Sequence, residues 1–328
     1  MLSVCTLIHF AVDGLCAAVM AGYAVNEPDF ARIVYYFSLY NATAFGGQWI
    51  AGLMLDKHNR FILPSLVIVP VLLALGMLTE AGIFFQAIFL GLGNCIFHVA
   101  AGIIIMIRSD NFREPGIFVS SGAVGLGLGL GSFVGALWFW ALCTGGTIIL
   151  VHRLLKDRTA YTFSRDDTHI SAPVFAGALI LLLCVVMRGF GGNSNIPEYA
   201  MLMPCVYMLG KSAGGIVCDI IGYRKTILLI FIMCFVSLQL SGYASLILLT
   251  FAFNMTMPLT LRLLHRYFPE YPGLTFGLAA GCLLPGAFFG EYMRIFPDVM
   301  AAVQFMGMFA AWLIFCRYGR CAESLQHS

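Results

Sequence analysis

The chain has 328 residues, of which 60% are hydrophobic and only 10% are charged, and its formal net charge is +2. Soluble domains carry about 25% charged residues, so this composition excludes an ordinary water-exposed surface and predicts a membrane protein. The small net charge also argues against a nucleic-acid partner. The 11 cysteines lie singly within apolar runs and are interpreted as buried apolar side chains.

Apolar stretches of membrane-spanning length follow one another along the whole chain. Because Met1 runs almost directly into the first of them, no cleavable signal peptide is expected. The segment from Gly122 to Trp140 lacks a polar break, so the boundary between the fifth and sixth spans is the least defined. The twelve expected helices leave no room for a soluble domain: 3–24, 30–54, 61–80, 82–107, 115–134, 135–153, 172–193, 197–218, 224–242, 244–264, 271–290 and 298–317.

Lysine and arginine are distributed unevenly between the two ends of these spans. With both termini in the cytoplasm, the outer face has only Arg32 and Arg294, while Arg188 and Lys211 fall within spans. The positive-inside rule predicts this bias for a multi-pass protein of the cell (inner) membrane with cytoplasmic termini. The cytoplasmic face has the other basic residues: Lys57, Arg60, Arg108, Arg113, Arg153, Lys156, Arg158, Arg165, Arg224, Lys225, Arg262, Arg266, Arg317 and Arg320.

Three similarities in the same order indicate an internal duplication. The segment 47–56 resembles 210–219, the Pro-Gly pair 115–116 resembles 272–273, and Asn94 corresponds to Asn254. Parallel repeats of this kind are found in transporters whose substrate site lies near the membrane midplane between the repeats. The expected organisation is an N-terminal six-helix half (1–153), a cytoplasmic linker (154–171) and a C-terminal six-helix half (172–328).

The turns after the second and eighth spans resemble the signature loop G-x-x-x-D-x-x-G-x-R-K/R of the major facilitator superfamily. The first copy has Asn59 where glycine is usual. The resemblance implies an all-α membrane fold of twelve helices in two pseudo-symmetric six-helix bundles, and a gating latch at these turns. Glycine allows close helix approach, and the aspartate can hold a helix N-terminus or a basic residue; a capped, charged turn is the alternative. The latch residues are Gly52, Asp56 and Arg60 in the first copy, and Gly215, Asp219, Gly222, Arg224 and Lys225 in the second.

Four further segments resemble the fosmidomycin-resistance-like branch of drug exporters within this superfamily: 9–13, 39–48, 93–98 and the glycine-rich stretch 122–135. This resemblance implies export. The chain departs from exporter patterns at Ala87, where many proton-coupled exporters have arginine, and at Gly131-Ser132, where a Gly-Pro pair is usual. The glycines are interpreted first as close helix packing, with a bending role as the alternative.

Charged side chains within spans each cost about 2.5–3.5 kcal/mol on insertion and so need a purpose or a partner. Asp13 lies near the middle of the first span, with His9 one turn away on the same face. We expect Asp13 to be the proton-coupling site and His9 its modulator; a hydrogen-bonded pair that fastens the helix to a neighbour is the alternative. Arg188 is expected to pair with Asp13 or to bind an anionic substrate, or else to reach the outer interface.

Other polar residues are candidates for substrate binding. His98 follows Asn94 by one turn in the fourth span, and the resemblance places these with Asn254 along the cavity. Lys211 either reaches the cavity or extends toward the cytoplasm. For His98, a satisfied packing residue on an apolar helix is the alternative. The wall residues expected on the second span are Tyr36, Tyr40 and Asn41.

These features predict a monomeric secondary active transporter of a small organic solute, with alternating access, proton coupling and no cofactor. The membrane charges lean positive, which predicts an anionic substrate. The nearest alternative is a divalent-metal permease, and a non-transporting receptor or scaffold is the alternative of another class. An enzyme is not expected, because the His9–Asp13 pair has no evident nucleophile or metal triad beside it. The permease would use His9, Asp13, His98, Cys95, Met255 and Met257.

Overall fold

The computed structural model describes residues 1–78, 80, 82–157, 161, 163, 172–190 and 199–293. All regular structure in these residues is helical. The α-helices are α1 (Leu2–Asn26), α2 (Phe30–Asn41), α3 (Gln48–Lys57), α4 (Ile62–Gly76), α5 (Gly82–Arg108), α6 (Arg113–Leu130), α7 (Ala136–Lys156), α8 (Ala172–Phe190), α9 (Leu202–Ile221), α10 (Tyr223–Ser237), α11 (Gly242–Tyr267), α12 (Pro272–Gly281) and α13 (Leu283–Met293); η1 (Ala42–Gly46) is a π-helix and η2 (Asn59–Phe61) a 3₁₀-helix.

Eleven of the twelve expected spans correspond to helices in the described part of the chain. The second expected span consists of α2, η1 and α3, which follow one another without a break, and the eleventh consists of α12 and α13. Within the described residues, seven helical segments are long and apolar enough to cross a membrane by themselves. The twelfth expected span, 298–317, and most of the linker 154–171 lie outside the described residues.

The undefined boundary between the fifth and sixth spans is a short loop. Helix α6 ends at Leu130 and α7 begins at Ala136, and Ser132 between them has a positive φ of 56°. No charged residue marks this loop, because Gly131 at the end of α6 and the tight turn at Ser132 are enough to end the helix. This explains why hydropathy alone gave no boundary there.

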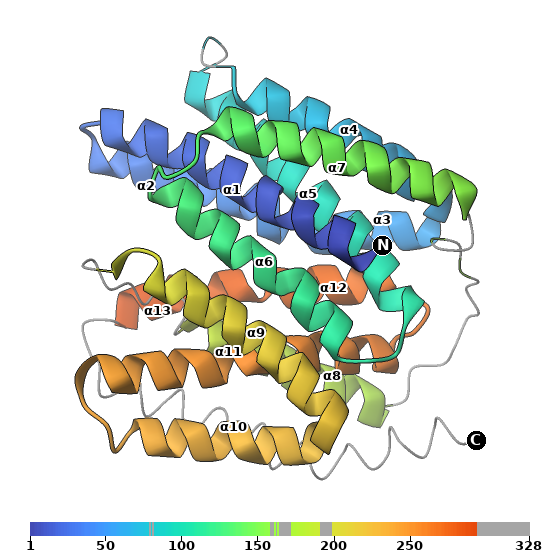
Figure 1. Cartoon of the computed structure of the whole chain (residues 1–328), viewed down its shortest axis with the longest axis vertical. Helices are drawn as coiled ribbons and strands as arrows, with labels where there is room; N and C mark the ends of the chain where they lie inside the picture. Colours follow the sequence, from blue (N-terminus) through green and yellow to red (C-terminus); the bar gives the residue numbers. More distant parts are fainter. Residues whose placement is uncertain are drawn as a thin grey trace.

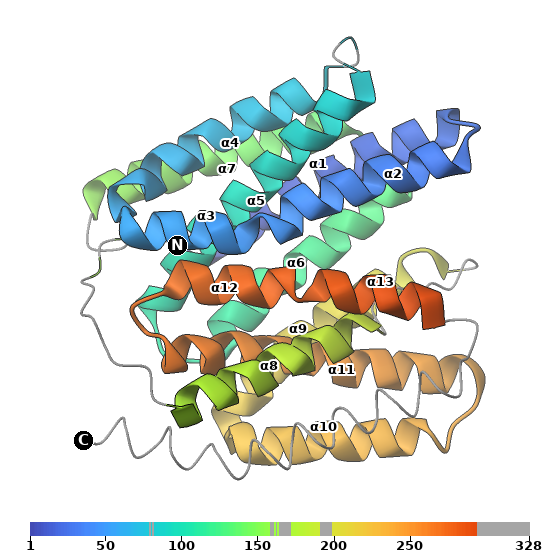
Figure 2. The same ribbon diagram turned by 180° about the vertical axis from the view of Figure 1, so that it is seen from behind.

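The helices lie in two groups, α1–α7 and α8–α13, which occupy the upper and lower parts of Figure 1. The groups meet most extensively where α6 packs on α9 and where α3 packs on α12 (Figures 1 and 2). Each of these pairs joins one helix from each group. The expected gating turns lie in α3 and at the end of α9, so the fold brings both of them to the contact between the groups.

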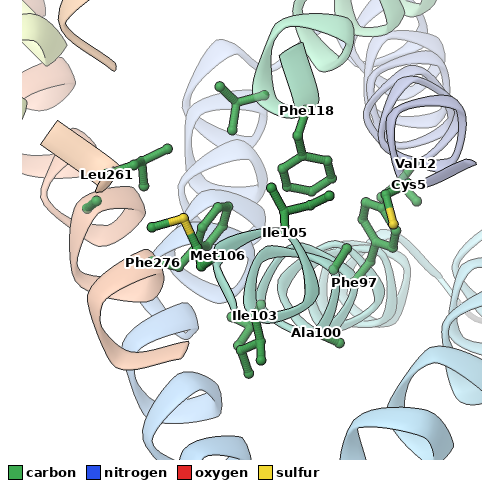
Figure 3. Close-up of a cluster of buried hydrophobic side chains, with 14 of the residues drawn as sticks. Cys5, Val12, Phe97, Ala100, Ile103, Ile105, Met106, Phe118, Leu261 and Phe276 are labelled. Carbon is green, nitrogen blue, oxygen red and sulfur yellow. The ribbon is translucent and has the colours of Figure 1, made fainter. Parts of the chain in front are cut away.

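Buried aromatic side chains reinforce this contact (Figure 3). Phe118 on α6 lies 6.1 Å from Phe276 on α12 and 6.3 Å from Phe97 on α5, measured between ring centroids. A β-carbon at Gly102 would lie 2.7 Å from the Phe276 ring, so the absence of a side chain there makes room for the ring. Ring pairs at these separations each add about 0.5–1.5 kcal/mol beyond the burial of their area.

Candidate functional site

The carboxylate of Asp56 caps the first turn of a helix in the other group. The backbone N–H groups of Gly273 and Leu274 donate to Asp56 Oδ1 and Oδ2 at 2.8 and 2.7 Å. Gly52 lies against the carbonyl of Gly273, where a β-carbon would overlap it. Pro272 opens the helix and has no N–H of its own, so Asp56 satisfies the next two donors.

The second gating turn makes the same arrangement in the opposite direction. Phe112 and Arg113, at the start of α6, donate their N–H groups to the two carboxylate oxygens of Asp219 at 2.8 and 3.0 Å. Gly215 lies against the carbonyl of Phe112. Each group of helices therefore holds the beginning of a helix in the other. Hydrogen bonds to a charged group contribute about 1.5–3 kcal/mol each.

The residues that follow the two aspartates differ between the copies. Gly222 has φ +81°, which glycine adopts without strain, and it ends α9 and starts α10. Asn59 starts the helix η2 instead, and its side chain donates to the carbonyl of Phe163 at 3.1 Å. The departure from glycine in the first copy thus accompanies a different turn. The guanidinium groups of Arg60 and Arg224 lie over the adjacent rings of Phe61 and Tyr223, and Lys225 is exposed.

A polar cluster joins α1 and α5 within the first group of helices. His9 and His98 approach each other with their Nε2 atoms 2.7 Å apart. The Asp13 carboxylate lies beside both imidazoles, with Oδ2 3.2 Å from His9 Nε2 and Oδ1 3.6 Å from His98 Nε2. Asn94 donates its Nδ2–H to Asp13 Oδ1 at 2.9 Å and to the Tyr40 hydroxyl at 3.2 Å. We call these five residues the histidine–aspartate cluster.

Backbone carbonyls determine the tautomers of both histidines in this cluster. His9 Nδ1 lies 2.7 Å from the carbonyl oxygen of Phe118 on α6, and His98 Nδ1 lies 2.8 Å from that of Asn94. A carbonyl only accepts, so each Nδ1 carries the hydrogen and donates it. Both Nε2 atoms of the neutral rings are then acceptors, and two acceptors at 2.7 Å repel unless a cation lies between or beside them.

Glycines of α6 create the space that the cluster occupies. A β-carbon at Gly122 would overlap Asp13 Oδ2 and His9 Nε2. About one and two turns further along, Gly125 and Gly129 lie against the carbonyls of Phe10 and Gly14 on α1. The glycine-rich stretch therefore packs helices closely, as expected, and its first member also leaves room for two polar side chains.

Substitution of Gly122 by Ala is expected to lower the thermal stability of the purified protein and to disturb the cluster. The added methyl group has no free volume, and overpacking of this kind costs about 1–3 kcal/mol. Gly145→Ala on α7 is the matched control, since a β-carbon there meets nothing within 4 Å. Equal melting temperatures for the two variants in the same detergent would contradict this interpretation of Gly122.

Arg188 lies in the last turn of α8, buried in the second group of helices. It is 5% exposed, and its Nη1 donates to Thr256 Oγ1 at 3.5 Å and Thr260 Oγ1 at 3.3 Å. Its Nη2 has no hydrogen-bond partner in the part of the chain that the structure describes. Within the described residues Arg188 makes no ion pair, so the expected pairing with Asp13 is not observed there. The half-buried Lys211 is close enough to interact electrostatically with both Arg188 and Asp13.

The remaining candidate side chains make no hydrogen bond or ion pair with the cluster among the described residues. Asn254 donates to the carbonyl of Thr250 on its own helix at 2.9 Å, although it corresponds to Asn94 in the repeat. Tyr36 packs against Tyr23 and Tyr35 near the end of α1. Asn41, next to Tyr40, is half-buried.

Only some of the ligands expected for a divalent-metal permease lie close together in the described residues. Three of its expected ligands, His9, Asp13 and His98, come together with their ligand atoms within 4.8 Å of one another. Cys95 points toward Gly47, and Met255 lies against Gly214 on α9.

Several contributors to these sites were not expected from the sequence. The carbonyl of Phe118 has no sequence signal, because every residue carries one. Thr256 and Thr260 face the same side of α11, since they are four residues apart, and this spacing opposite an intramembrane arginine was the available signal.

Comparisons with known proteins show the fold. No protein-family model and no curated protein matches the chain. Among solved structures, a bacterial homologue of the iron transporter ferroportin in an outward-facing state matches with a TM-score of 0.69 and 12% identity, over 98% of this chain and 100% of that one.

Two other solved structures have the same arrangement. One is the same kind of ferroportin homologue with soaked iron, with a TM-score of 0.65, 11% identity, and 97% and 99% coverage. The other is FucP, a major facilitator superfamily transporter in the outward conformation, with a TM-score of 0.57, 12% identity, and 97% and 98% coverage. The fosmidomycin-resistance-like branch stays a prediction. The chain has the fold of the major facilitator superfamily transporters.

Proposed function

We propose that this protein is a secondary active transporter that moves a small organic anion by alternating access, coupled to protons at the histidine–aspartate cluster. The 2.7 Å approach of the two Nε2 atoms carries the proposal. The protein would have twelve spans in two related six-helix halves, act as a monomer, and lie in the cell membrane with both termini in the cytoplasm. Export rests on the resemblance to the exporter branch alone.

The geometry of the cluster suits a protonated histidine pair better than a neutral one. With both Nδ1–H groups engaged by carbonyls, one proton between His9 and His98 converts a repulsive pair of acceptors into a hydrogen bond. The adjacent carboxylate of Asp13 balances the added positive charge. Away from water, an unbalanced charge of either sign would be costly, so proton and carboxylate stabilise each other.

The reciprocal caps support an alternating-access mechanism. Asp56 and Asp219 join the two groups of helices at the end that carries the basic turns. In the proposed orientation this is the cytoplasmic end, which is closed here, and the protein would face outward. The three similar structures are also described as outward-facing or outward.

Arg188 supports an anionic substrate. An arginine that is 5% exposed, with a free Nη2 and two threonine hydroxyls beside it, has unused donors for a carboxylate or a phosphate. Lys211 adds a second positive charge nearby.

Uptake into proteoliposomes under an imposed pH gradient tests the function. A panel of carboxylates and phosphate esters should contain a solute that accumulates above its equilibrium level and is released by a protonophore. Arg188→Gln should weaken binding of that solute by about tenfold to a hundredfold, since one or two charge-assisted hydrogen bonds are lost. The exposed Arg113→Gln is the control, because Arg113 binds Asp219 through its backbone. If no anion is accumulated and neutral solutes are, the proposed substrate class is wrong.

A further inference from the structure

The histidine–aspartate cluster also has the donor set of a metal site. His9, His98 and Asp13 present two imidazole nitrogens and a carboxylate within 4.8 Å of one another. Two histidines with one carboxylate is a combination that first-row transition metals favour, whereas Ca²⁺ and Mg²⁺ prefer oxygen ligands alone.

Each of the three side chains has a further hydrogen bond of the kind that orients the ligands in protein metal sites. Each histidine donates its Nδ1–H to a backbone carbonyl, which leaves Nε2 free to coordinate and fixes the ring orientation. Asn94 donates to Asp13 Oδ1, and Oδ2 remains on the side of His9 Nε2. The absence of a side chain at Gly122 keeps the space beside these two atoms free.

The spacing needs a small adjustment for a metal. At metal–nitrogen bonds of about 2.0–2.1 Å and tetrahedral angles, two ligand nitrogens stand about 3.3 Å apart. The Nε2 atoms are 2.7 Å apart, whereas the distances from Asp13 to the two rings are 3.2 and 3.6 Å. Only the histidine pair must separate, by about 0.6 Å, and the shared proton must leave.

We propose that His9, His98 and Asp13 form a binding site for a divalent first-row transition metal ion, which enters in place of the proton between the histidines. This goes beyond the proposed function, which needs only the proton. The coordination would be His9 Nε2, His98 Nε2 and an Asp13 carboxylate oxygen, with a further position open to water or to an anion. Because the metal and the proton occupy the same space, they compete.

Cobalt binding to the full-length, tag-free protein tests the site. Titration with CoCl₂ should give a saturable visible absorption band at one equivalent, and ZnCl₂ should displace it. His9→Gln and His98→Gln should each weaken binding at least as much as loss of an outer-shell contact does, about 10–100-fold. His58→Gln, at an exposed histidine outside the cluster, should leave the affinity unchanged.

A second measurement uses the unmodified protein, so its result does not depend on whether the histidine variants fold. Calorimetric titration in two buffers of different protonation enthalpy should show about one proton released per metal, and the affinity should rise about tenfold per pH unit while that proton competes. Absence of a one-equivalent band, binding without proton release, or equal loss in His58→Gln would each overturn the proposal. Proton-driven transport without metal binding would overturn the metal site alone, and metal binding without proton-driven transport would overturn the proposed coupling alone.

Discussion

Substitution of Asp13 by Asn is expected to abolish solute accumulation driven by a pH gradient while leaving solute exchange across the membrane intact. Asparagine keeps the shape of the side chain and an oxygen for the Asn94 amide, but it removes the negative charge 3.2 Å from His9 Nε2. At an effective dielectric constant of 20, that charge interacts with a protonated imidazole by about 4–5 kcal/mol. A loss of about 3 kcal/mol would already reduce proton occupancy about a hundredfold.

Two assays on the same proteoliposomes separate the expected effects. Gradient-driven uptake should fall to the level of empty vesicles, and exchange of internal for external labelled solute should proceed at the normal rate. Asp29→Asn is the matched control, because Asp29 is an exposed carboxylate that caps α2 outside the cluster. Driven uptake by the Asp13 variant at the normal rate would show that the coupling proton is held elsewhere.

Removal of one gating aspartate is expected to loosen both contacts between the helix groups. Asp56→Ala leaves the N–H groups of Gly273 and Leu274 without their acceptor. Two charge-assisted bonds are lost, about 3–6 kcal/mol in total, so the closed state should open at least about a hundredfold more often. Asp219 holds Phe112 at the same end of the molecule, so an opening of that end breaks its bonds too.

Hydrogen exchange measures this directly, because the affected groups are backbone amides. In Asp56→Ala, exchange should accelerate in the segment 272–276 and also in 111–115. Asp29→Ala, at an exposed position far along the sequence from both turns, should change neither segment. Faster exchange confined to 272–276 would mean that the two caps open independently, and unchanged exchange in both would remove their gating role.

The helical architecture was largely predictable because lipid imposes one simple requirement, a sequence of apolar stretches of fixed length. The boundary after Leu130 was not, since a turn made by small residues leaves no polar signal. The duplicated Gly–Asp turns predicted that each aspartate could hold the N-terminal end of a neighbouring helix, and Asp56 and Asp219 both do so. Which helix each aspartate would cap followed only from the three-dimensional arrangement, because Asp56 and Gly273 are far apart in sequence.

The candidate site shows the same division. A one-turn spacing was enough to place His9 beside Asp13 and Asn94 beside His98, because helix periodicity is local. The meeting of the two pairs depends on how α1 packs on α5 and α6, which no local pattern encodes. Asn254 illustrates the limit: it corresponds to Asn94 by repeat position, yet its amide bonds to its own helix.

Helix α6 takes part both in the contact between the helix groups, through its first turn, and in the histidine–aspartate cluster, through residues further along. Its first turn is held by Asp219, the carbonyl of Phe118 holds the His9 ring, and Gly122 faces the Asp13 carboxylate. These points lie within the ten residues from Arg113 to Gly122, about 13 Å of helix. A helical segment of this length bends little, so a displacement of the first turn of α6 would also move the Phe118 carbonyl that orients His9. If the proposed function is right, occupancy of the histidine pair and closure of the basic end would be linked through this single helix.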